Sequence, residues 1–497
     1  MCGVVGYIGH RDAVPVLLSG LTKLEYRGYD SAGVAVLNEE TDTINVRKTK
    51  GRIENLQNLL LTSPIQGHLG IGHTRWATHG APSDVNAHPH SSNDSKFAVV
   101  HNGIIENYME FKEELEAKGY KFKSETDTET VVHLIDSYYN EGMDLLDAVF
   151  KVLDRIEGSY ALGIVCKDFP DTLIAARKDS PLVVGIGEGE NFIASDMPAI
   201  LNYTKNVYLL DDKEVAIIKA DSIEILNDKK EPVKKEVFTY NWDIEAAEKN
   251  GYDHFMLKEI YEQPKVVKDN ISSRFSDDGK SIKLDGIKLG KKELENINRI
   301  YIVACGTAFY AGQVGKFLIE RIARIPVNSE VASEFRYKDP LIDEHTLMIV
   351  VSQSGETADT LAVLRVSKKQ GAKVLAITNV VGSSVAREAD DVFYTLAGPE
   401  IAVASTKAYI TQLVAFYILA LHFAEVKGTL ASSEIESIKK ELIAIPNKIN
   451  ELLKNKDNIQ KYASYHFNQK DLFFLGRGLD FAVALEGSLK LKEISYI

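Results

Sequence analysis

A cysteine at the second position of the chain carries the first chemistry that the sequence suggests. Cys2 opens a glycine-rich apolar octet that runs to Gly9. If Met1 is removed, this residue presents a thiol and a free α-amine together. An amine with a pKa of about 8 can take the thiol proton and return it to a leaving group. The competing interpretation is structural, because a cysteine at the start of an apolar strand is usually buried in a core.

Five polar segments of the first half decide between these interpretations. They cover residues 25–33, 72–80, 88–90, 99–107 and 124–129. Together with Cys2, in this order, they resemble the glutaminase domain of the class II amidotransferases, the N-terminal-nucleophile family. The resemblance implies that Cys2 attacks the side-chain amide of glutamine.

The same resemblance implies roles for the matching residues. Asn102 and the backbone N–H of Gly103 would form the oxyanion hole, which suits a carboxamide and a glycine amide. Arg75 would pair with the α-carboxylate of glutamine and Asp127 with its α-ammonium group. The implied glutamine-binding set comprises Arg75, Trp76, Thr78, His79 and Asp127, and Trp76 lies where the family gates the passage of ammonia.

A second chemical segment, rich in hydroxyl groups, covers residues 347–360. An apolar strand leads into Ser352, Ser354 and Thr357, and a helix follows. Hydroxyl groups and the N–H groups of a helix N-terminus make an anion cradle. The segment lacks the lysine of a P-loop, which favours a sugar phosphate over a nucleoside triphosphate. On spacing alone, simple capping of the helix by a serine or threonine is an equally good interpretation.

Three segments of the second half, residues 304–307, 352–360 and 403–407, resemble the sugar isomerase (SIS) domain of the glutamine–fructose-6-phosphate aminotransferase family. Residues 255–264 resemble that family's interdomain segment. The resemblance implies a sugar-phosphate site made of Thr307, Ser352, Gln353, Ser354, Thr357, Val403 and Ser405. One position departs from the family, because Ala308 replaces the usual serine after the Cys-Gly-Thr turn and removes a hydroxyl contact.

Glu486, Lys490 and Glu493 have the i, i+4, i+7 spacing that puts side chains on one face of a helix. Such pairs usually decorate exposed helices. The family resemblance instead implies that Glu493 moves a proton between C1 and C2 of the sugar, while Glu486 and Lys490 assist ring opening and charge balance.

The family's histidine and Schiff-base lysine would lie beyond Ile497. We therefore expect the 497-residue chain to hydrolyse glutamine but to make little glucosamine 6-phosphate.

The elements that position these residues change in character along the chain. The first half predicts short strands at 4–8, 33–37, 97–100, 160–166, 172–177 and 215–219, and helices at 12–24, 108–118 and 128–139. This mixture favours a layered α+β domain around antiparallel sheets, the N-terminal-nucleophile (Ntn) sandwich of the resemblance. Residues 184–190 mimic a dinucleotide loop, but their glutamates favour a glycine hairpin between strands.

The second half alternates strands and helices, which predicts a parallel, doubly wound α/β sheet. Strands are expected at 300–304, 347–351, 374–378 and 392–395, and helices at 309–324 and 360–370. A weak repeat of the 300–307 pattern at 472–479 predicts a strand, a glycine turn and a helix. We expect a glutaminase domain at 1–240, a linker at 241–285, a first SIS domain at 286–445 and the incomplete start of a second one at 460–497.

Composition excludes several classes of function. The formal charge of −13 disfavours nucleic acid and anionic membranes as partners. Three widely spaced cysteines and the lack of a signal-peptide pattern indicate the reducing cytoplasm. The longest apolar stretch, 413–421, favours a buried helix over a membrane span. The five histidines from His73 to His101 follow no zinc-ligand spacing, so we expect no metal and no organic cofactor.

The function that the resemblance implies is the transfer of ammonia from glutamine to fructose 6-phosphate with isomerisation, giving glucosamine 6-phosphate. The resemblance also implies a homodimer. A glutaminase-only fragment and a sugar-phosphate-binding regulator remain the alternatives. A purine-pathway or asparagine-forming amidotransferase is disfavoured, because no phosphoribosyl or ATP-pyrophosphatase loop is visible after residue 240.

Overall fold

The computed structural model describes residues 2–240, 248–276 and 281–497. The chain forms two compact units, Met1–Ile244 and Glu245–Ile497. In the first unit the strands are β1 (Gly3–Gly9), β2 (Ser31–Asn38), β3 (Thr43–Lys50), β4 (Leu69–Arg75), β5 (His90–Ser91), β6 (Phe97–Ile105), β7 (Gly158–Cys166), β8 (Leu173–Lys178), β9 (Val183–Ile186), β10 (Glu190–Ala194), β11 (Asn206–Leu209), β12 (Val215–Ile218), β13 (Ile223–Leu226) and β14 (Phe238–Thr239). Its helices are α1 (Ala13–Lys23), α2 (Ile53–Thr62), α3 (Tyr108–Ala117), α4 (Thr128–Asn140), α5 (Leu145–Arg155) and the 3₁₀ turn η1 (Met197–Ala199).

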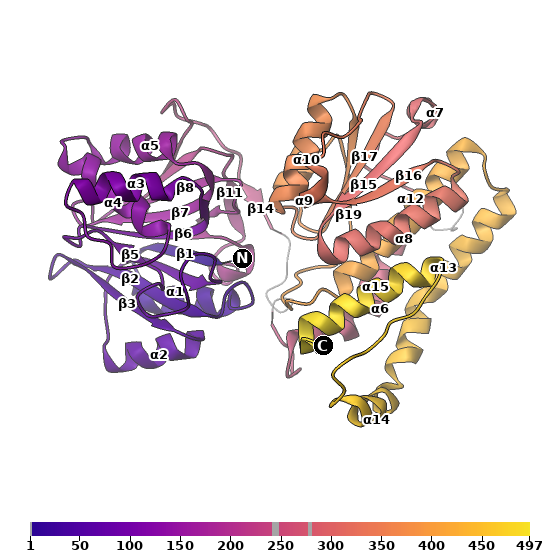
Figure 1. The fold of residues 1–497 in the computed structure, drawn as a ribbon, viewed down its shortest axis with the longest axis horizontal. Coiled ribbons are helices and arrows are strands. Elements are labelled where there is room, and N and C mark those ends of the chain that lie inside the picture. Colours follow the sequence, from indigo (N-terminus) through magenta and orange to yellow (C-terminus); the bar gives the residue numbers. More distant parts are fainter. Residues whose placement is uncertain (1, 241–247, 277–280) are drawn as a thin grey trace. The chain divides into compact units, whose positions relative to one another are not determined.

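Two antiparallel sheets stack face to face in the first unit. The larger has the order β14-β11-β9-β10-β1-β4-β2-β3, and the smaller has the order β13-β12-β8-β7-β6-β5. Apolar side chains of β1, β4, β6 and β7 fill the space between the sheets. Helices α3, α4 and α5 cover the outer face of the smaller sheet, and α1 packs on the larger one (Figure 1). The predicted Ntn sandwich is confirmed.

The local chemistry explains why these elements form. Asp12 caps α1 by accepting a hydrogen bond from the N–H of Val14, which satisfies a free donor of the first turn. The buried residues of α1 recur at helical spacing, with Val16, Leu17 and Leu21 facing the sheet. Every strand and helix predicted above for the first half is present. The glycine segment 184–190 is the predicted hairpin, because β9 and β10 pair antiparallel.

The second unit contains β15 (Arg299–Ala304), β16 (Val327–Val331), β17 (Thr346–Ser352), β18 (Lys373–Thr378) and β19 (Asp391–Tyr394). Its helices are α6 (Phe255–Ser272), α7 (Lys291–Asn296), α8 (Gly306–Ile322), α9 (Ala332–Phe335), α10 (Ala358–Lys369), α11 (Ser384–Glu388), α12 (Lys407–Lys427), α13 (Ser432–Leu453), α14 (Lys456–His466) and α15 (Leu479–Ser495). All neighbouring strands are parallel, in the order β16-β15-β17-β18-β19. The predicted doubly wound sheet is confirmed.

Helices cover both faces of this parallel sheet. One core joins the sheet to α6, α8 and α12, and the other joins it to α9 and α10. Within the described ranges, α12 is the one helix long and apolar enough to cross a membrane, but its most apolar window is 61% buried in the unit. That burial is typical of a core helix, which is what the sequence predicted for residues 413–421.

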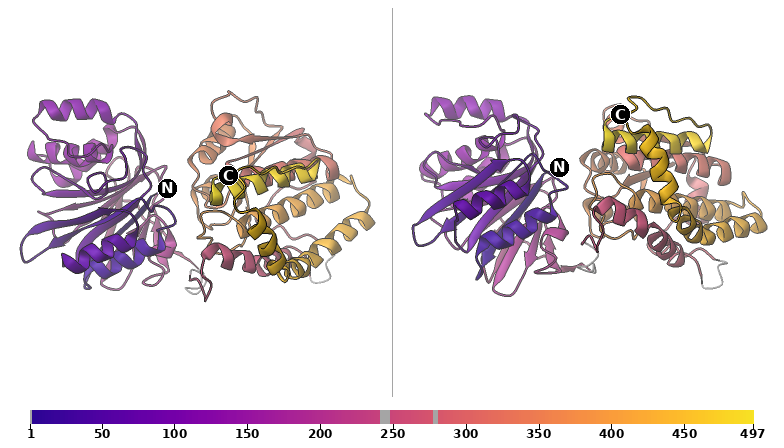
Figure 2. Two further views of the ribbon diagram at one scale, coloured as in Figure 1. Left: turned by 60° about the horizontal axis from the view of Figure 1, so that its bottom comes forward. Right: turned by 90° about the horizontal axis from the view of Figure 1, so that it is seen from below.

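The predicted strand at the start of the second repeat is wrong. Residues 471–477 form neither helix nor strand, whereas the predicted helix after them is present as α15. A strand is stabilised by hydrogen bonds to a neighbouring strand, and no strand among the described residues lies beside this segment. The helix α15, yellow in Figures 1 and 2, packs against α8 instead.

Candidate active sites

Cys2 lies just before β1, at the edge of the sheet where β1 begins and the antiparallel β4 ends. The pairing of Gly3 with Thr74 sets this position, because it brings residue 2 beside the end of β4. The Cys2 sulfur accepts a hydrogen bond from the Trp76 N–H at 3.2 Å. Burial raises the pKa of the Cys2 thiol, although the Trp76 contact opposes the shift. A thiol with a raised pKa needs a base to become a nucleophile.

Asn102, on β6, has a carboxamide of defined orientation. Its Nδ2 donates to the Cys2 carbonyl at 2.8 Å, and its Oδ1 lies 3.1 Å from Nε2 of His73. Burial lowers the pKa of His73 to about 3, so the ring is neutral. Its Nε2 also lies 3.0 Å from the His101 carbonyl, which can only accept, so Nε2 carries the ring proton. The carboxamide nitrogen of Asn102 therefore faces Cys2.

Gly103 follows Asn102 at a position that only glycine can occupy. Its φ is +136°, and a Cβ there would lie 2.0 Å from the carbonyl oxygen of Ser159. A side chain would push β6 away from β7 beside Cys2.

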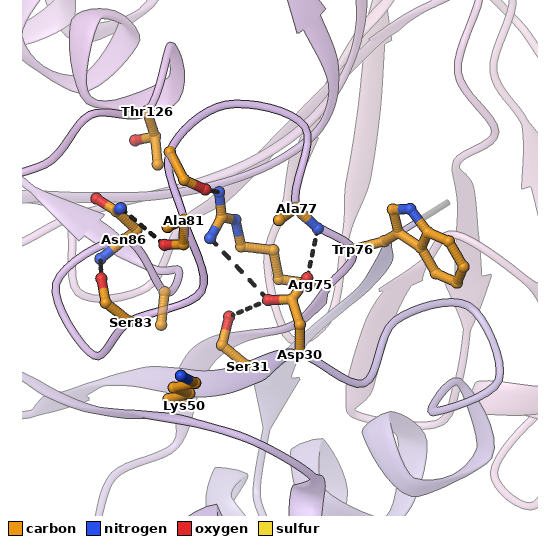
Figure 3. Close-up of polar contacts among 12 residues, drawn as sticks. Asp30, Ser31, Lys50, Arg75, Trp76, Ala77, Ala81, Ser83, Asn86 and Thr126 are labelled. Atoms are coloured by element: carbon orange, nitrogen blue, oxygen red, sulfur yellow. Dashed lines mark hydrogen bonds and ion pairs between the residues drawn. The ribbon is translucent and has the colours of Figure 1, made fainter.

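Arg75 ends β4 and is buried beneath the loop that follows (Figure 3). Its Nη2 donates to the carbonyls of His79 and Gly80, the latter at 2.8 Å. Its Nη1 is buried without a hydrogen bond to any residue that the structure describes, and the nearest carboxylate, that of Asp30, is 4.0 Å away. A buried donor without an acceptor is costly, so Nη1 is available to a carboxylate ligand.

Asp30 also binds the loop that follows β4. Its carboxylate accepts hydrogen bonds from the Ala77 N–H and the Ser31 hydroxyl (Figure 3). Asp30 thereby holds the backbone of Trp76 near Cys2, while the Trp76 ring stays 42% exposed and packs edge-on against Tyr29. The sequence segment 25–33 contained Asp30, but its role could not be inferred before the fold was known.

Asp127 precedes α4 and is 4% exposed. Its Oδ2 accepts a hydrogen bond from the Ile105 N–H at 2.8 Å and lies 3.9 Å from Nδ1 of His101. Burial lowers the pKa of His101, so this histidine is neutral and leaves the Asp127 carboxylate available to a cation.

One pocket collects nearly all the predicted glutaminase residues. Its lining is Cys2, Arg75, Trp76, Thr78, His79, His88, His101, Gly103, Thr126, Asp127 and Thr128. Asn102 stands behind this lining, hydrogen-bonded to Cys2. The sequence did not single out Thr126, Thr128, His88 or His101 as pocket residues, because their motif positions carry no chemical signature of their own.

The histidines of this region are packed against one another. The rings of His73 and His88 stack with centroids 4.2 Å apart, and His90 meets His88 edge-on at 4.7 Å. Burial holds the pKa of His88 and of His90 well below the ordinary range. No cluster of three or more histidine, cysteine or acidic side chains suited to a metal occurs among the described residues.

In the second unit the hydroxyl-rich segment lies at the carboxyl end of β17, beside β15. The strand order reverses between these two strands, and ligands of doubly wound sheets bind at such a point. The Ser352 and Thr357 hydroxyls lie 2.9 Å apart, and Ser352 Oγ accepts from the Gly355 N–H. Thr357 makes no side-chain cap to α10, so simple capping does not explain its hydroxyl.

The remaining predicted sugar-phosphate residues differ in their surroundings. Gln353 and Ser354 are half-buried in the same turn, where Ser354 Oγ accepts from the Glu356 N–H at 3.2 Å. Val403 is 62% exposed, and the Ser405 hydroxyl donates to Glu400 at 2.8 Å. Ser405 is therefore already paired here.

Ala308 packs its methyl group against the apolar core of the second unit. The first turn of α8 thus presents the Thr307 hydroxyl but no second one at position 308.

Glu486 lies on the buried side of α15. Its Oε1 accepts from the Thr307 hydroxyl at 3.1 Å and lies 3.5 Å from Nζ of Lys490. Its Oε2 is buried without a hydrogen bond to the described residues. Burial raises the pKa of Glu486 to about 7, against the effect of Lys490. Lys490 also pairs with Glu493, so the three residues share one face, as their spacing predicted.

Two family models match separate parts of the chain. The glutamine amidotransferase domain matches residues 73–202, and the SIS domain matches residues 293–422. The chain is 60% identical over 497 residues to a glutamine–fructose-6-phosphate aminotransferase (isomerizing) of Clostridium tetani, covering 100% of this chain and 81% of that protein. The chain belongs to the glutamine–fructose-6-phosphate aminotransferase family.

Other members are similar over the same span. The aminotransferase of Caldanaerobacter subterraneus is also 60% identical, with coverage of 100% of this chain and 81% of its own length. Among solved structures, the C-terminal domain of glucosamine-fructose-6-phosphate aminotransferase from Francisella tularensis is 46% identical and covers 50% of this chain and 70% of that one, with a TM-score of 0.48.

Proposed function

We propose that the chain is a glutamine–fructose-6-phosphate aminotransferase: it releases ammonia from glutamine and transfers it to fructose 6-phosphate, with isomerisation to glucosamine 6-phosphate. The observation that carries this proposal is 60% identity to such an aminotransferase along all 497 residues. No observation favours a glutaminase-only function or a regulator.

In the glutaminase step, Cys2 is the nucleophile. With Met1 removed, its α-amine accepts the thiol proton, and the sulfur forms a bond to the amide carbon of glutamine. The amide C–N bond breaks as the amine returns the proton, which releases ammonia. Water then cleaves the thioester to give glutamate. Asn102 and the N–H of Gly103 would stabilise the oxyanion, since Asn102 is hydrogen-bonded to Cys2 and Gly103 lines the same pocket.

Glutamine is positioned by complementary charges in the pocket. Arg75 offers its unpaired Nη1 to the α-carboxylate, and Asp127 offers a carboxylate to the α-ammonium group. Thr78 and His79 line the same pocket, and Trp76 would gate the passage of ammonia.

Binding and turnover are expected to respond to different substitutions in this site. Arg75→Ala and Asp127→Ala should mainly raise KM for glutamine, because they contact groups that the reaction leaves unchanged. Asn102→Ala should mainly lower kcat, by on the order of 10²–10³-fold for a lost oxyanion donor. Steady-state glutaminase kinetics measure both constants. Arg75→Lys serves as the control, because it keeps the positive charge but loses the paired N–H donors of the guanidinium. The opposite split would contradict these roles.

In the sugar half, we propose that the Ser352–Thr357 turn holds the phosphate, with Gln353 and Ser354 beside it. Val403 and Ser405 would border the sugar. On binding, the Ser405 hydroxyl would replace its hydrogen bond to Glu400 with one to the ligand. Thr307 would orient Glu486, which acts with Lys490 and Glu493 in ring opening and proton transfer.

Loss of the turn's hydroxyls is expected to weaken sugar binding alone. Ser352→Ala combined with Thr357→Val should raise the Kd for fructose 6-phosphate by at least tenfold, since each hydrogen bond to a charged group contributes about 1.5–3 kcal/mol. Calorimetric titration with the sugar phosphate measures this, and basal glutaminase should remain near the parent level. Ser367→Ala, a buried hydroxyl that bonds within α10, is the control. Equal affinity in the double variant and the parent would place the phosphate elsewhere.

The function as a whole is tested by measuring glutamate release with and without fructose 6-phosphate, together with amino-sugar formation. Glutamine that is not hydrolysed would overturn the proposal. We also propose a cytoplasmic homodimer that needs no metal or organic cofactor. The proposed domains are a glutaminase domain at 1–240, an interdomain segment at 241–285, a SIS domain at 286–445 and part of a second SIS domain at 460–497. Residues 241–247 and 277–280 of the interdomain segment lie outside the described ranges.

A further inference from the structure

Lys48, on β3, ends in an unusual environment for a lysine. Its Nζ donates hydrogen bonds to the carbonyls of Val85 at 3.0 Å, Ala87 at 2.7 Å and Pro89 at 3.2 Å. An ammonium group has three donors and no acceptor, so all three are used by one backbone segment, residues 85–89. Lys48 thus holds the end of the loop that begins after Arg75.

The absence of a side chain at Gly33 leaves room for Lys48 to reach this segment. Lys48 stands directly opposite Gly33 in the pairing of β2 with β3. A Cβ at Gly33 would lie 2.2 Å from the His88 carbonyl oxygen and 2.5 Å from the Lys48 Cβ. Because Gly33 has no side chain, segment 85–89 lies directly on β2 and the lysine passes beside it.

Contacts continue from this segment to the reacting atoms. His88 lies between two of the carbonyls that Lys48 binds, and its ring stacks on His73 at 4.2 Å and 17°. His73 bonds to Asn102 Oδ1 at 3.1 Å, and Asn102 Nδ2 bonds to the Cys2 carbonyl at 2.8 Å. Each ring and amide in this series is buried, so a shift at His88 moves the next member of the series.

We propose that Lys48 is a positioning residue of glutamine hydrolysis, which acts through His88 and His73 on the carboxamide of Asn102. This inference rests on the proposed function and adds a residue that does not touch the pocket. Lys48 does not contact glutamine. It holds the segment that keeps the oxyanion donor in place.

The charge of Lys48 matters because a neutral amine has only two N–H donors for three carbonyls. Burial lowers the pKa of Lys48 to about 8. The other charged or titratable groups that act on it are Glu129, Lys123, Arg75, Asp84 and His90. As pH rises through about 8, the third hydrogen bond is lost and a lone pair faces a carbonyl oxygen.

Lys48→Met is expected to lower the glutaminase kcat about 10- to 100-fold, the effect of a displacement of about 1 Å at a reacting group. KM for glutamine should change less than about threefold, because the oxyanion donor acts in the transition state. Lys50→Met is the matched control: it removes the same charge two residues along the same strand, from an exposed side chain, and should keep the parent kcat. Lys48→Arg, which retains the cation and its donors, should recover most of the loss.

Two further measurements separate positioning from general structural damage. If Lys48 acts through Asn102, then Lys48→Met should add little to Asn102→Ala, so the double variant is less impaired than the product of the single effects. The kcat of Lys48→Arg should also persist to higher pH than that of the parent, because a guanidinium stays protonated. This comparison remains available if Lys48→Met does not fold. If kcat falls at the same high pH in Lys48→Arg and in the parent, the inference is overturned.

A parent-like kcat in folded Lys48→Met, an equal loss in Lys50→Met, or multiplicative effects with Asn102→Ala would each refute the role of Lys48 while leaving the glutaminase itself intact. A parent protein that does not hydrolyse glutamine would overturn the proposed function, and this inference with it.

Discussion

Cys2→Ala is expected to abolish glutamine hydrolysis, with a fall in kcat on the order of 10⁴-fold or more, as for the loss of other catalytic nucleophiles. The pocket can still bind glutamine through Arg75 and Asp127, but no other thiol lines it. Release of glutamate measures the effect. Cys166→Ala is the matched control, because this second thiol is buried in the core of the same unit and should leave turnover unchanged.

The thiol alone does not explain the expected rate. Burial raises the pKa of Cys2, so at neutral pH the free thiolate is scarce, and a base beside it sets the speed. Burial lowers the pKa of His73, His88 and His101, which makes them weak bases, and His73 is also hydrogen-bonded to Asn102. The α-amine of Cys2 is the base that the proposed mechanism uses.

A chain that keeps an extension ahead of Cys2 is therefore expected to lose most of its glutaminase activity, although its thiol and pocket are unchanged. An amide nitrogen in place of the amine cannot accept the proton. Cleaving the extension with a protease that exposes Cys2 should restore turnover. Full activity with a blocked N-terminus would remove the amine from the mechanism and assign the base to another group.

Much of the fold was predictable because its pattern is local. The strands 300–304 and 347–351 are unbroken apolar runs, and α1 shows helical spacing. The strand β4 was not predicted, since Gly70, Gly72 and His73 interrupt its apolar residues. The structure gives the reason for the glycines: a Cβ at Gly72 would lie 2.9 Å from a methyl of Leu21, so α1 packs closely on this part of the sheet. That reason exists only in the folded chain.

The candidate sites divide in the same way. Cys2, Arg75, Asn102 and Asp127 were predicted because each lies in a motif that resembles the glutaminase family, and the fold brings these four residues together. Lys48 could not, because its partners are backbone carbonyls that any sequence offers. The spacing of Glu486 and Lys490 predicted a shared face but not its burial, since exposed ion pairs repeat at the same interval.

Burial of Glu486 has chemical consequences that lead to the second large effect. Its carboxyl group has a pKa of about 7, so at neutral pH it can both give and accept a proton, which ring opening of a sugar requires. Oε2 is the oxygen without a hydrogen bond to the described residues, and it is therefore free for the sugar. Glu486→Gln keeps the shape and removes the exchangeable acid.

We expect Glu486→Gln to lower the formation of glucosamine 6-phosphate by about 10²–10⁴-fold, the usual contribution of a general acid–base group. Basal glutaminase should stay at the parent level. Product formation and glutamate release are measured in the same reaction. Glu436→Gln, in the first turns of α13, is a control that removes one carboxylate of the second unit from an exposed side chain. Parent-like synthesis in Glu486→Gln would exclude this carboxylate from the reaction.

The same substitution is expected to change how stability depends on pH. The folded pKa of Glu486 is about 7, above its ordinary value of 4.5, so between these values the folded chain binds more protons at this group than the unfolded chain. The stability contributed by this group is therefore fully present below pH 4.5 and is lost as pH rises through about 7. Glutamine does not titrate, so Glu486→Gln should gain stability relative to the parent across this window.

Chemical denaturation of parent and variant at matched pH values measures the difference in free energy of unfolding. Lys490 lowers the pKa of Glu486, and Lys490→Met should therefore move the upper end of the window to higher pH. A difference between parent and Glu486→Gln that stays constant with pH would mean that the buried carboxyl group keeps its ordinary pKa. In that case its place beside Thr307 would be structural, and the acid–base step of ring opening would fall to another group.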